Sequence, residues 1–356
     1  MPPRPFASAR ASRRIAVIGA GLAGLSCART LVQAGHRVTV FELERQVGGR
    51  MASCDTAFGT FDHGAQYFTV RDQRFEQALA TAGGSFKPWS ANAVRVLDPH
   101  GRVAEAALRT REPHFVGVPA MDAITARWAR PLFESGSIEL RTRVNRIERD
   151  TLDATRWQLR TSGPEDSVHV FSGFDATLLA LPCAPARALL RASAQSALSQ
   201  RMDDVEVAPC WSLMLAFPNA VQPSLGTLGP QWNAALSTHH RIAWLARESS
   251  KPGRSPVERW TVQASPAWSQ EHLEDDEPTV LAKLHKAFAE VTGIRAEPAH
   301  AELFRWRNAK TLKPLGQPML WDSALGLGAC GDWCLGHRAE DAFVSGLELA
   351  LAVTRS

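Results

Sequence analysis

The sequence predicts an α/β protein built on a mostly parallel, doubly wound sheet, with an interleaved α+β second domain that contains an antiparallel sheet. A strand–helix–strand pattern opens the chain, a glycine-rich turn separates its first strand from its helix, and strand-like runs dominate the middle. The chain has 356 residues. This exceeds one ordinary domain of roughly 100 to 200 residues, so two domains are expected.

The opening unit predicts two strands around one helix. Residues 15–19, IAVIG, form a short apolar run that is typical of a strand buried on both faces of a parallel sheet. Residues 22–34 carry apolar side chains at helical spacing, and Gly35 stands where a left-handed residue would end the helix. Residues 37–42, RVTVFE, predict the second strand, which a right-handed crossover would place parallel to the first.

The later segments divide between two domains. Strands are predicted at 141–150 and 155–163, and the run 168–182 would rejoin the first sheet. Strands at 211–217, 242–246 and 259–264 and a helix at 279–291 are assigned to the second domain, with the acidic residues 274–277 as favourable charge at the helix N-terminus. We expect the first domain to comprise 14–75, 136–184 and 320–356, the second 76–135 and 185–319, and residues 1–13 to be a disordered extension.

Composition excludes several classes of protein. Lys and Arg outnumber Asp and Glu by 40 to 36, and these charges are scattered, so nucleic acid is not an expected partner. No apolar stretch reaches the roughly 20 residues of a membrane span. The six cysteines form no CxxC pair, which predicts reduced thiols and a cytoplasmic protein. The 11 histidines include no HExxH spacing, and no metal site is expected.

A GxGxxG motif lies between the first strand and the helix. Gly19 would make the tight turn, Gly21 would let the backbone approach a pyrophosphate, and Gly24 would allow close packing of helix on strand. Glu42 follows at the spacing of an acidic residue that accepts hydrogen bonds from a ribose. The motif predicts a Rossmann-like dinucleotide site, for NAD or FAD, with contacts from Gly19, Ala20, Gly21, Leu22, Ala23, Gly24, Glu42 and Leu43.

A second glycine pair favours FAD over NAD. Gly48, Gly49 and Arg50 follow Glu42 closely, and they would let the backbone and one guanidinium close around the pyrophosphate. Taken alone, the same residues would be interpreted as a flexible turn before a surface arginine. Beside the first motif they predict further contacts from Gly48, Gly49, Arg50 and Met51.

These motifs resemble a known family. The segment 15–42 followed by VGGRMAS resembles the start of FAD-dependent amine oxidases and their relatives, and FDHGAQYF at 61–68 resembles bacterial renalases, in which a glycine-containing loop lies beside the flavin. The run FDATLLALP at 174–182 is similar to the strand that enters the flavin domain. The resemblance implies a Rossmann-like FAD-binding domain with a three-layer sheet and helix core. It also implies flavin contacts from Gly64, Ala65, Gln66, Tyr67 and Val144.

The C-terminal end resembles the same family. CGDWCL at 330–335 and EDAFVSG at 340–346 look like renalase segments, as do 116–129, 244–254 and 260–273, so the likeness covers nearly the whole chain. In the family, the pair at Gly331 and Asp332 contacts the ribityl and pyrophosphate groups, and the following helix directs N–H groups at the flavin. Asp341 stands where the family pattern has glycine. The implied contacts are Gly331, Asp332, Glu340, Asp341 and Ala342.

The resemblance implies oxidation of dihydronicotinamide isomers of NAD(P)H to NAD(P)+, with hydride transfer to N5 of a non-covalent FAD and reoxidation by O2 to H2O2. Amine oxidation is the enzymatic alternative, and a non-catalytic flavin-binding protein is the third. Amine oxidases place tyrosines near the flavin, whereas this chain has one tyrosine, Tyr67. Tyr67 and Trp333 are predicted to border the substrate, with a packed core role equally open for Trp333.

No catalytic side chain is assigned from the sequence. A lysine that holds water near the flavin occurs in some amine-oxidising relatives, but Lys310 and Lys313 are interpreted as surface residues. The segment 304–316 is expected to border the substrate site. An anionic dinucleotide substrate would be met by some of the basic residues Arg241, Arg247, Lys251, Arg254, Arg305, Arg307 and Arg338.

Overall fold

The structure is a computed structural model that describes residues 11–89, 94–105, 112–164, 167–221 and 232–356. Most of the extension predicted over residues 1–13 lies outside the described residues. Its end is held on the first domain, because the Ser12 hydroxyl donates to the Gly35 carbonyl at 2.8 Å and Arg13 donates to the Val353 carbonyl at 3.2 Å.

The first domain contains a six-stranded sheet in the order β19-β20-β13-β1-β2-β9. Only the pairing of β19 with β20 is antiparallel. The four apolar residues of β1 are at most 4% exposed, which is expected of a strand covered on both faces. The strands are β1 (Arg14–Ile18), β2 (Arg37–Phe41), β9 (Ile138–Glu139), β13 (Ala176–Leu179), β19 (Leu320–Asp322) and β20 (Leu327–Ala329).

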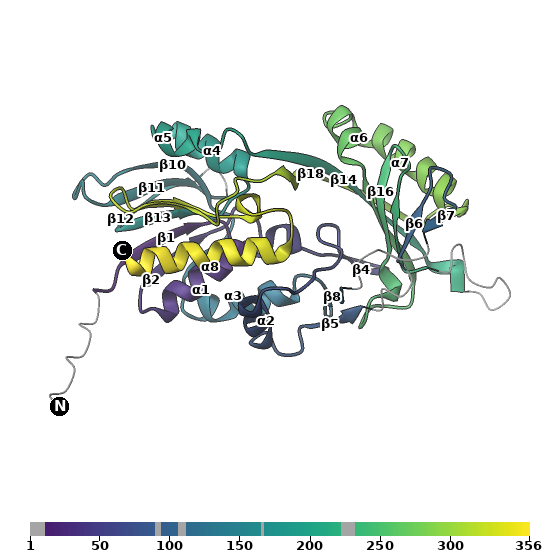
Figure 1. The fold of residues 1–356 in the computed structure, drawn as a ribbon, viewed down its shortest axis with the longest axis horizontal. Coiled ribbons are helices and arrows are strands. Elements are labelled where there is room, and N and C mark those ends of the chain that lie inside the picture. The colour runs from purple at the N-terminus through teal and green to yellow at the C-terminus, as the bar shows by residue number, and fades with distance from the viewer. Residues whose placement is uncertain (1–10, 90–93, 106–111, 165–166, 222–231) are drawn as a thin grey trace.

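This sheet is the middle of three layers (Figure 1). One face packs against α1 (Leu22–Gln33), α3 (Ala123–Glu134) and α8 (Ala339–Arg355). The other face packs through Ile18 and Phe41 against Trp157 and Leu159 of a three-stranded antiparallel sheet. That layer consists of β10 (Arg143–Arg149), β11 (Trp157–Ser162) and β12 (Val168–Phe174), followed by α4 (Cys183–Ala192) and α5 (Ser196–Gln200). The predicted three-layer α/β class is confirmed.

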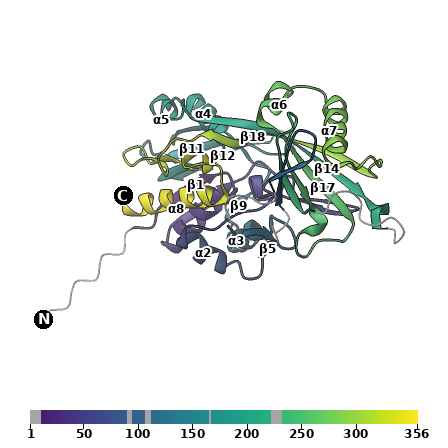
Figure 2. The same ribbon diagram turned by 45° about the vertical axis from the view of Figure 1, so that its right-hand side comes forward.

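The second domain is built on a seven-stranded sheet in the order β18-β14-β17-β16-β15-β6-β7. All neighbours are antiparallel except β15 and β6. Two helices, α6 (Pro266–Glu271) and α7 (Glu277–Thr292), lie against it (Figure 2). The strands are β6 (Val94–Leu97), β7 (Val103–Glu105), β14 (Glu206–Phe217), β15 (Ala234–Ser237), β16 (Ile242–Arg247), β17 (Glu258–Ala264) and β18 (His300–Lys313).

Short elements lie between the main strands and helices. They are η1 (Gly49–Met51), β3 (Cys54–Thr56), β4 (Gly59–Phe61), α2 (Gln73–Ala80), β5 (Phe86–Trp89), β8 (His114–Gly117), η4 (Pro218–Val221), η5 (Glu248–Ser250) and η6 (Asp332–Cys334). β3 pairs with β4 and β5 with β8. The end of α8 and the start of β1 lie together, at the end of the molecule away from the second sheet (Figures 1 and 2).

The predicted elements are present, and the main departure is β18. The helix predicted at 22–34 is α1, with Gly35 at φ +86 after it, and the acidic residue Asp276 caps α7 by accepting from Thr279 N. No element was predicted at 300–313, where β18 pairs along β14. Buried and exposed side chains do not alternate along β18. Backbone pairing with its buried neighbour β14 therefore determines this strand, and an alternating hydrophobic pattern does not. The domain boundaries stay a prediction.

Candidate functional site

Two glycines of the N-terminal turn are required by packing. Gly19 ends β1 at φ +104, and a Cβ there would stand 2.5 Å from the Ala180 carbonyl oxygen. A Cβ on Gly24 would overlap the Gly19 carbonyl, because α1 lies directly against the turn. Larger side chains at either position would separate the helix from the strand.

Packing within the protein does not require glycine at position 21, the middle glycine of the motif. Gly21 has φ −71, which any residue adopts, and no atom of the other described residues lies within 4 Å of a Cβ built there. It is the N-cap of α1, whose first turn has neither a side-chain cap nor an acidic residue. An open space before an uncapped helix N-terminus fits the phosphates of a dinucleotide, because the free N–H groups and the helix dipole attract negative charge.

The second glycine turn packs against the first. Gly48 and Gly49 have φ +122 and +55, and Gly48 N donates to the Ala20 carbonyl at 3.0 Å. A Cβ on Gly49 would stand 3.3 Å from Gly21 Cα. The two motifs therefore form one surface of backbone, as a shared pyrophosphate site requires.

Glu42 lies at the end of β2 beside this surface. Its carboxylate is held by N–H groups of Ala20 at 2.7 Å and Glu44 at 3.0 Å, and the residue is 8% exposed. Burial raises the pKa of Glu42, partly offset by the two backbone hydrogen bonds. A fixed carboxylate at this position fits the ribose hydroxyls of a dinucleotide. Leu43, next in the chain, is 46% exposed, and Val144 lies at an irregularity in β10.

Arg50 joins the glycine turns to the C-terminal segment. Its guanidinium pairs with both carboxylate oxygens of Asp332, including Nη1 to Oδ2 at 2.8 Å, and Nη1 also donates to the Ala309 carbonyl at 3.2 Å. The Asp332 side chain is 4% exposed, and the Arg50 side chain is 29% exposed. Segments 282 residues apart are therefore in direct contact. This is the convergence that a single extended cofactor would need.

The C-terminal helix is held by its own polar groups. Gly331 N donates to the Ser345 hydroxyl at 3.0 Å, and Glu340 accepts from the N–H groups of Arg71 and Asp72, each at 2.6 Å. Asp341 accepts from Arg338 N at 2.9 Å and caps α8. Asp341, which departs from the family pattern, therefore stabilises the start of this helix. Both carboxylates have protein partners in this structure.

The loop after β4 lies beside the second glycine turn. Ala65 N donates to the Arg50 carbonyl at 2.8 Å, and a Cβ on Gly64 would overlap that same oxygen. Gln263 of β17 donates to the Gly64 carbonyl at 2.7 Å. Gln66 donates to the Gly64 carbonyl at 3.2 Å. The loop is therefore attached both to the glycine turns and to the second domain.

Tyr67 lies in an aromatic group that the sequence did not indicate. Its ring is 4.2 Å from His114, edge to face, and 5.4 Å from Trp244, between ring centroids. His114 Nδ1 and Trp244 Nε1 are buried and have no hydrogen-bond partner within the described ranges of the chain. Two unpartnered ring nitrogens around one half-buried tyrosine fit a planar polar ligand. No residue pattern in the sequence brings 67, 114 and 244 together.

Trp333 is packed in the core, which is one of the two roles that the sequence left open. It is 1% exposed, lies in the core between the sheet layers, and donates its indole N–H to the Leu181 carbonyl at 3.0 Å. Met51 is also buried, at 4% exposed, and Lys310 and Lys313 of β18 are exposed. Leu22, Ala23 and Ala342 lie along the contact of α1 with α8.

A buried group of four charges was also missed by the sequence reasoning. We call Asp62, Glu248, Lys251 and Arg254 the Asp62 cluster. Lys251 Nζ donates to Asp62 at 2.9 Å and to Glu248 at 2.8 Å, and Arg254 donates to Asp62 at 2.7 Å. All four side chains are at most 1% exposed. The cluster joins the loop after β4 to η5 of the second domain.

The two carboxyl groups of the Asp62 cluster differ in acidity. Burial alone would raise the pKa of Asp62, but the charges of Lys251 and Arg254 hold it below its ordinary value. Burial raises the pKa of Glu248 and outweighs the same two cations, and Glu248 Oε2 has no hydrogen-bond partner among the described residues. Asp62 is therefore the principal counterion of both basic residues.

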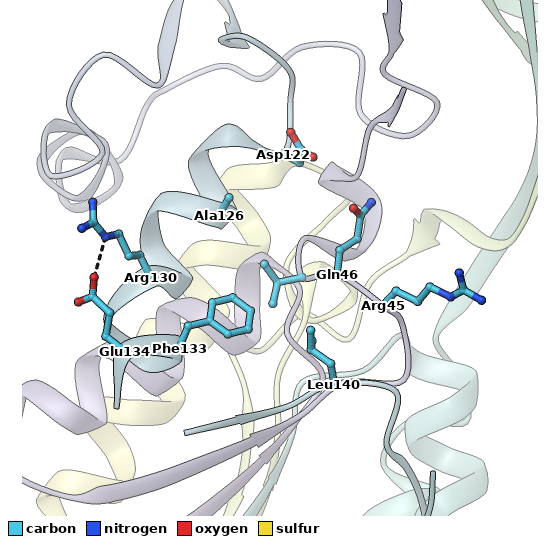
Figure 3. Close-up of a pocket in the computed structure, with 9 residues that line it drawn as sticks. Arg45, Gln46, Asp122, Ala126, Arg130, Phe133, Glu134 and Leu140 are labelled. Atoms are coloured by element: carbon cyan, nitrogen blue, oxygen red, sulfur yellow. Dashed lines mark hydrogen bonds and ion pairs between the residues drawn. The ribbon is translucent and has the colours of Figure 1, made fainter. Parts of the chain in front are cut away.

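Two pockets lie near the loop that follows β2. The first has a volume of about 440 Å³ and lies between residues 45–47, α3 and Leu140 (Figure 3). Its walls are mainly apolar, from Val47, Ala126, Phe133 and Leu140, and Arg130 pairs with Glu134 at its rim at 2.7 Å. None of the predicted cofactor residues lines it. The second pocket, of about 520 Å³, shares Gln46 and Asp122 with the first.

Comparison with known proteins agrees with the geometry of the two glycine turns. Residues 17–81 match the family described as an NAD(P)-binding Rossmann-like domain. Among curated proteins, a 4,4'-diapophytoene desaturase of Staphylococcus haemolyticus is 48% identical over 58 residues, and a flavin-containing monooxygenase of Arabidopsis thaliana is 63% identical over 38 residues. These matches cover 16% and 11% of this chain and 12% and 8% of the relatives.

Solved structures extend the likeness to the whole fold. A candidate protoporphyrinogen oxidase of Exiguobacterium sp. 255-15 has a TM-score of 0.75 at 14% identity, covering 97% of this chain and 99% of that one. The chain shares the fold of this solved structure. Cyclohexylamine oxidase of Brevibacterium oxydans IH-35A (TM-score 0.67, 12% identity) and wild-type putrescine oxidase (TM-score 0.68, 12% identity) share this fold over 97% of the chain, and cover 99% and 100% of those chains.

The two glycine turns and Glu42 lie within the matched Rossmann-like segment. The open space at Gly21, beside Glu42 and Gly49, fits a dinucleotide, in agreement with the match of residues 17–81 to a Rossmann-like domain. Among the described residues, no group of three or more His, Cys, Asp or Glu side chains is placed to hold a metal ion. No helix in the described part of the chain is long and apolar enough to cross a membrane.

Proposed function

We propose that this chain binds FAD non-covalently and acts as an oxidoreductase. The observation that carries the proposal is Gly21, which faces open space before an uncapped helix and contacts the second glycine turn. FAD would extend from Glu42 past Gly21 and Gly49 toward Arg50 and Asp332. When bound, it supplies the hydride acceptor, so the protein has to position and desolvate the substrate. The six unpaired thiols support our proposal of a reducing, cytoplasmic compartment.

We propose a dihydronicotinamide isomer of NAD(P)H as the substrate. The balanced reaction is loss of one hydride by the dihydropyridine ring to give NAD(P)+, with O2 and one proton taken up to give H2O2. The aromatic group of Tyr67, His114 and Trp244 suits a flat ring, and its two unpartnered nitrogens suit a carboxamide. Arg338 is near enough for its charge to act on the Tyr67 phenol, and it is the basic residue we assign to the substrate phosphates.

Amine oxidation is the second candidate, and the state of the basic residues favours it. Arg305 and Arg307 pair with Glu274. Lys251 and Arg254 are buried in the Asp62 cluster. These four side chains are therefore engaged within the protein, which leaves less positive charge for an anionic dinucleotide than the sequence indicates. Two proteins that share the fold are an amine oxidase for cyclohexylamine and one for putrescine.

Anaerobic reduction of the flavin separates these candidates. Holoenzyme is mixed, without O2, with the 2- and 6-dihydro isomers of NADH, with NADH itself and with primary amines, and the flavin absorbance is followed. Bleaching within seconds by a dihydro isomer, and release of H2O2 when O2 is admitted, is the expected result. Bleaching by an amine alone would assign amine oxidation, and an unbleached flavin with every donor would indicate a non-catalytic flavoprotein.

A matched pair of variants tests the aromatic group. We expect Trp244→Phe to raise KM for the dihydro isomer about tenfold, because a ring nitrogen that can bond a carboxamide is lost while the aromatic face is kept. Trp321→Phe removes another buried, unpartnered indole nitrogen, on β19 away from Tyr67, and serves as the control. Equal effects of the two substitutions would remove Trp244 from the substrate site.

A further inference from the structure

The second pocket is an open cleft between the two domains. Its walls are the β3–β4 hairpin, the segment 119–122 before α3, and the paired strands β14 and β18. Its volume of about 520 Å³ is enough for a small organic molecule. The residues on which the argument depends are Asp55, Asp122, Glu302, His63, Phe304 and Met214.

The cleft is acidic. Asp55, Asp122 and Glu302 line it, and neither Lys nor Arg is among the residues that line it. Within the described part of the chain, the Asp122 carboxylate has no ion-pair partner, and Glu302 pairs only with His300, at 3.3 Å. Burial raises the pKa of Asp122, with Asp62 and Asp55 adding to the effect. Burial also raises the pKa of the Cys54 thiol, with Glu302 and Asp55 adding to it.

The basic residues behind the cleft do not cancel this charge. Lys251 and Arg254 are in ion pairs with Asp62 and Glu248. The charge of Arg254 lowers the pKa of Asp122, but burial, Asp62 and Asp55 together raise it by more. The carboxylates at the surface keep their negative potential for a ligand.

One wall of the cleft is aromatic and exposed. Phe304, on the edge strand β18, is 39% exposed, and its ring centroid is 4.3 Å from that of His63 and 4.5 Å from that of Trp306. His63 is 5% exposed, and its Nδ1 is buried and has no hydrogen-bond partner in the part of the chain that the structure describes. Burial lowers the pKa of His63 to about 4, so the ring is neutral near pH 7. A neutral imidazole with its proton on Nε2 presents Nδ1 as an acceptor.

From these observations we infer that the cleft binds a small organic cation, an alkylammonium whose N–H groups are accepted by Asp122 and Glu302 and whose chain lies on Phe304 and Met214. Carboxylates recognise the charge, and the exposed ring adds a cation–π contact. A bare metal ion is a poor match, because the described residues place no group of three metal ligands here. The inference goes beyond the proposed oxidation, and binding does not require a flavin.

Calorimetric titration with three linear compounds of equal length tests this site. The as-purified protein is titrated at low ionic strength with hexane-1,6-diamine, hexane-1,6-diol and adipate. We expect a saturable heat with one diamine per chain, weakened by added salt, and no heat with the diol or adipate. Saturable binding of the diol would contradict the inference, and so would a diamine heat that does not saturate.

Substitutions in the cleft test whether the heat of diamine binding comes from this site. Asp122→Asn and Glu302→Gln are each expected to weaken diamine binding about tenfold, and Phe304→Leu about threefold. The control is Glu76→Gln, which removes the same charge from an exposed position on α2. Unchanged binding in both carboxylate variants, or equal weakening by the control, would overturn the inference. Circular dichroism of each variant establishes that it is folded, and flavin content is read separately from the visible absorbance.

Discussion

The glycine cradle and the Asp62 cluster are built from different materials. The cradle, at Gly19, Gly21, Gly24, Gly48 and Gly49, consists of backbone, and its residues lie within a short stretch of sequence. The Asp62 cluster consists of side-chain charges, and its partners Asp62 and Lys251 are 189 residues apart. The cradle has an open position at Gly21 that the described residues do not fill. In the Asp62 cluster, by contrast, the charged side chains pair with one another. The first region is therefore suited to bind a ligand and the second to hold two domains together.

The largest expected effect is on the cluster. Asp62→Asn leaves Lys251 and Arg254 buried without their shared counterion, and we expect it to lower the free energy of unfolding by about 3–5 kcal/mol. Urea denaturation followed by tryptophan fluorescence measures this. The double variant Asp62→Asn/Lys251→Met should recover part of the loss. Glu274→Gln, which removes an exposed carboxylate with two arginine partners, is the control, and a similar loss there would contradict the account.

Two alanine substitutions within the cradle should give opposite results. Gly24→Ala places a Cβ onto the Gly19 carbonyl, and we expect a loss of about 3 kcal/mol in the free energy of unfolding. Gly21→Ala enters open space, so the unfolding free energy of the flavin-free protein should stay within about 0.5 kcal/mol of wild type. Its affinity for FAD should fall at least about tenfold, because the Cβ occupies the approach of the pyrophosphate. Retained affinity in Gly21→Ala would contradict the assignment of this space.

Acid should lower the free energy of unfolding through His63, which follows Asp62 directly in the chain. Its pKa is lowered to about 4 by burial, against an ordinary value of 6.5, so the unfolded chain binds a proton in a range where the folded protein does not. Its contribution to stability is complete above pH 6.5 and is lost as the pH falls toward 4. We expect it to cost about 2 kcal/mol between pH 7.5 and 5.0. Urea midpoints should show a smaller pH dependence in His63→Phe, while the exposed control His169→Phe keeps that of wild type.

The smallest effect is expected where the cradle meets the C-terminal segment. Arg50→Lys keeps the charge but loses the paired contact with Asp332, and the ion pair is partly exposed, so we expect a loss of about 1 kcal/mol in the free energy of unfolding. FAD retention during gel filtration should decrease as well. If Arg50→Lys retains FAD as wild type does, Arg50 pairs with Asp332 without contributing to cofactor binding.

The cradle could be predicted from the sequence because its geometry is local. Gly19, Gly21 and Gly24 are close neighbours, and each has a conformational or steric role that a pattern records. Asp62 lies 189 residues before Lys251, and no spacing rule shows that they pair. The same limit applies to His114 and Trp244 around Tyr67. The position of Trp333 beside Asp332 was compatible with a cavity wall and with a core role. Local sequence could not decide between them, and the residue lies in the core.

The most direct test is titration of flavin-free protein with FAD and, separately, with FMN, followed by flavin fluorescence. FMN lacks the adenylate half that Glu42 and the Gly21 turn are proposed to hold. We expect one FAD per chain and an affinity for FAD at least about a hundredfold above that for FMN. Equal affinities for the two flavins, or no binding of either by folded protein, would contradict the claim that both glycine turns and the Asp332 segment hold one FAD molecule.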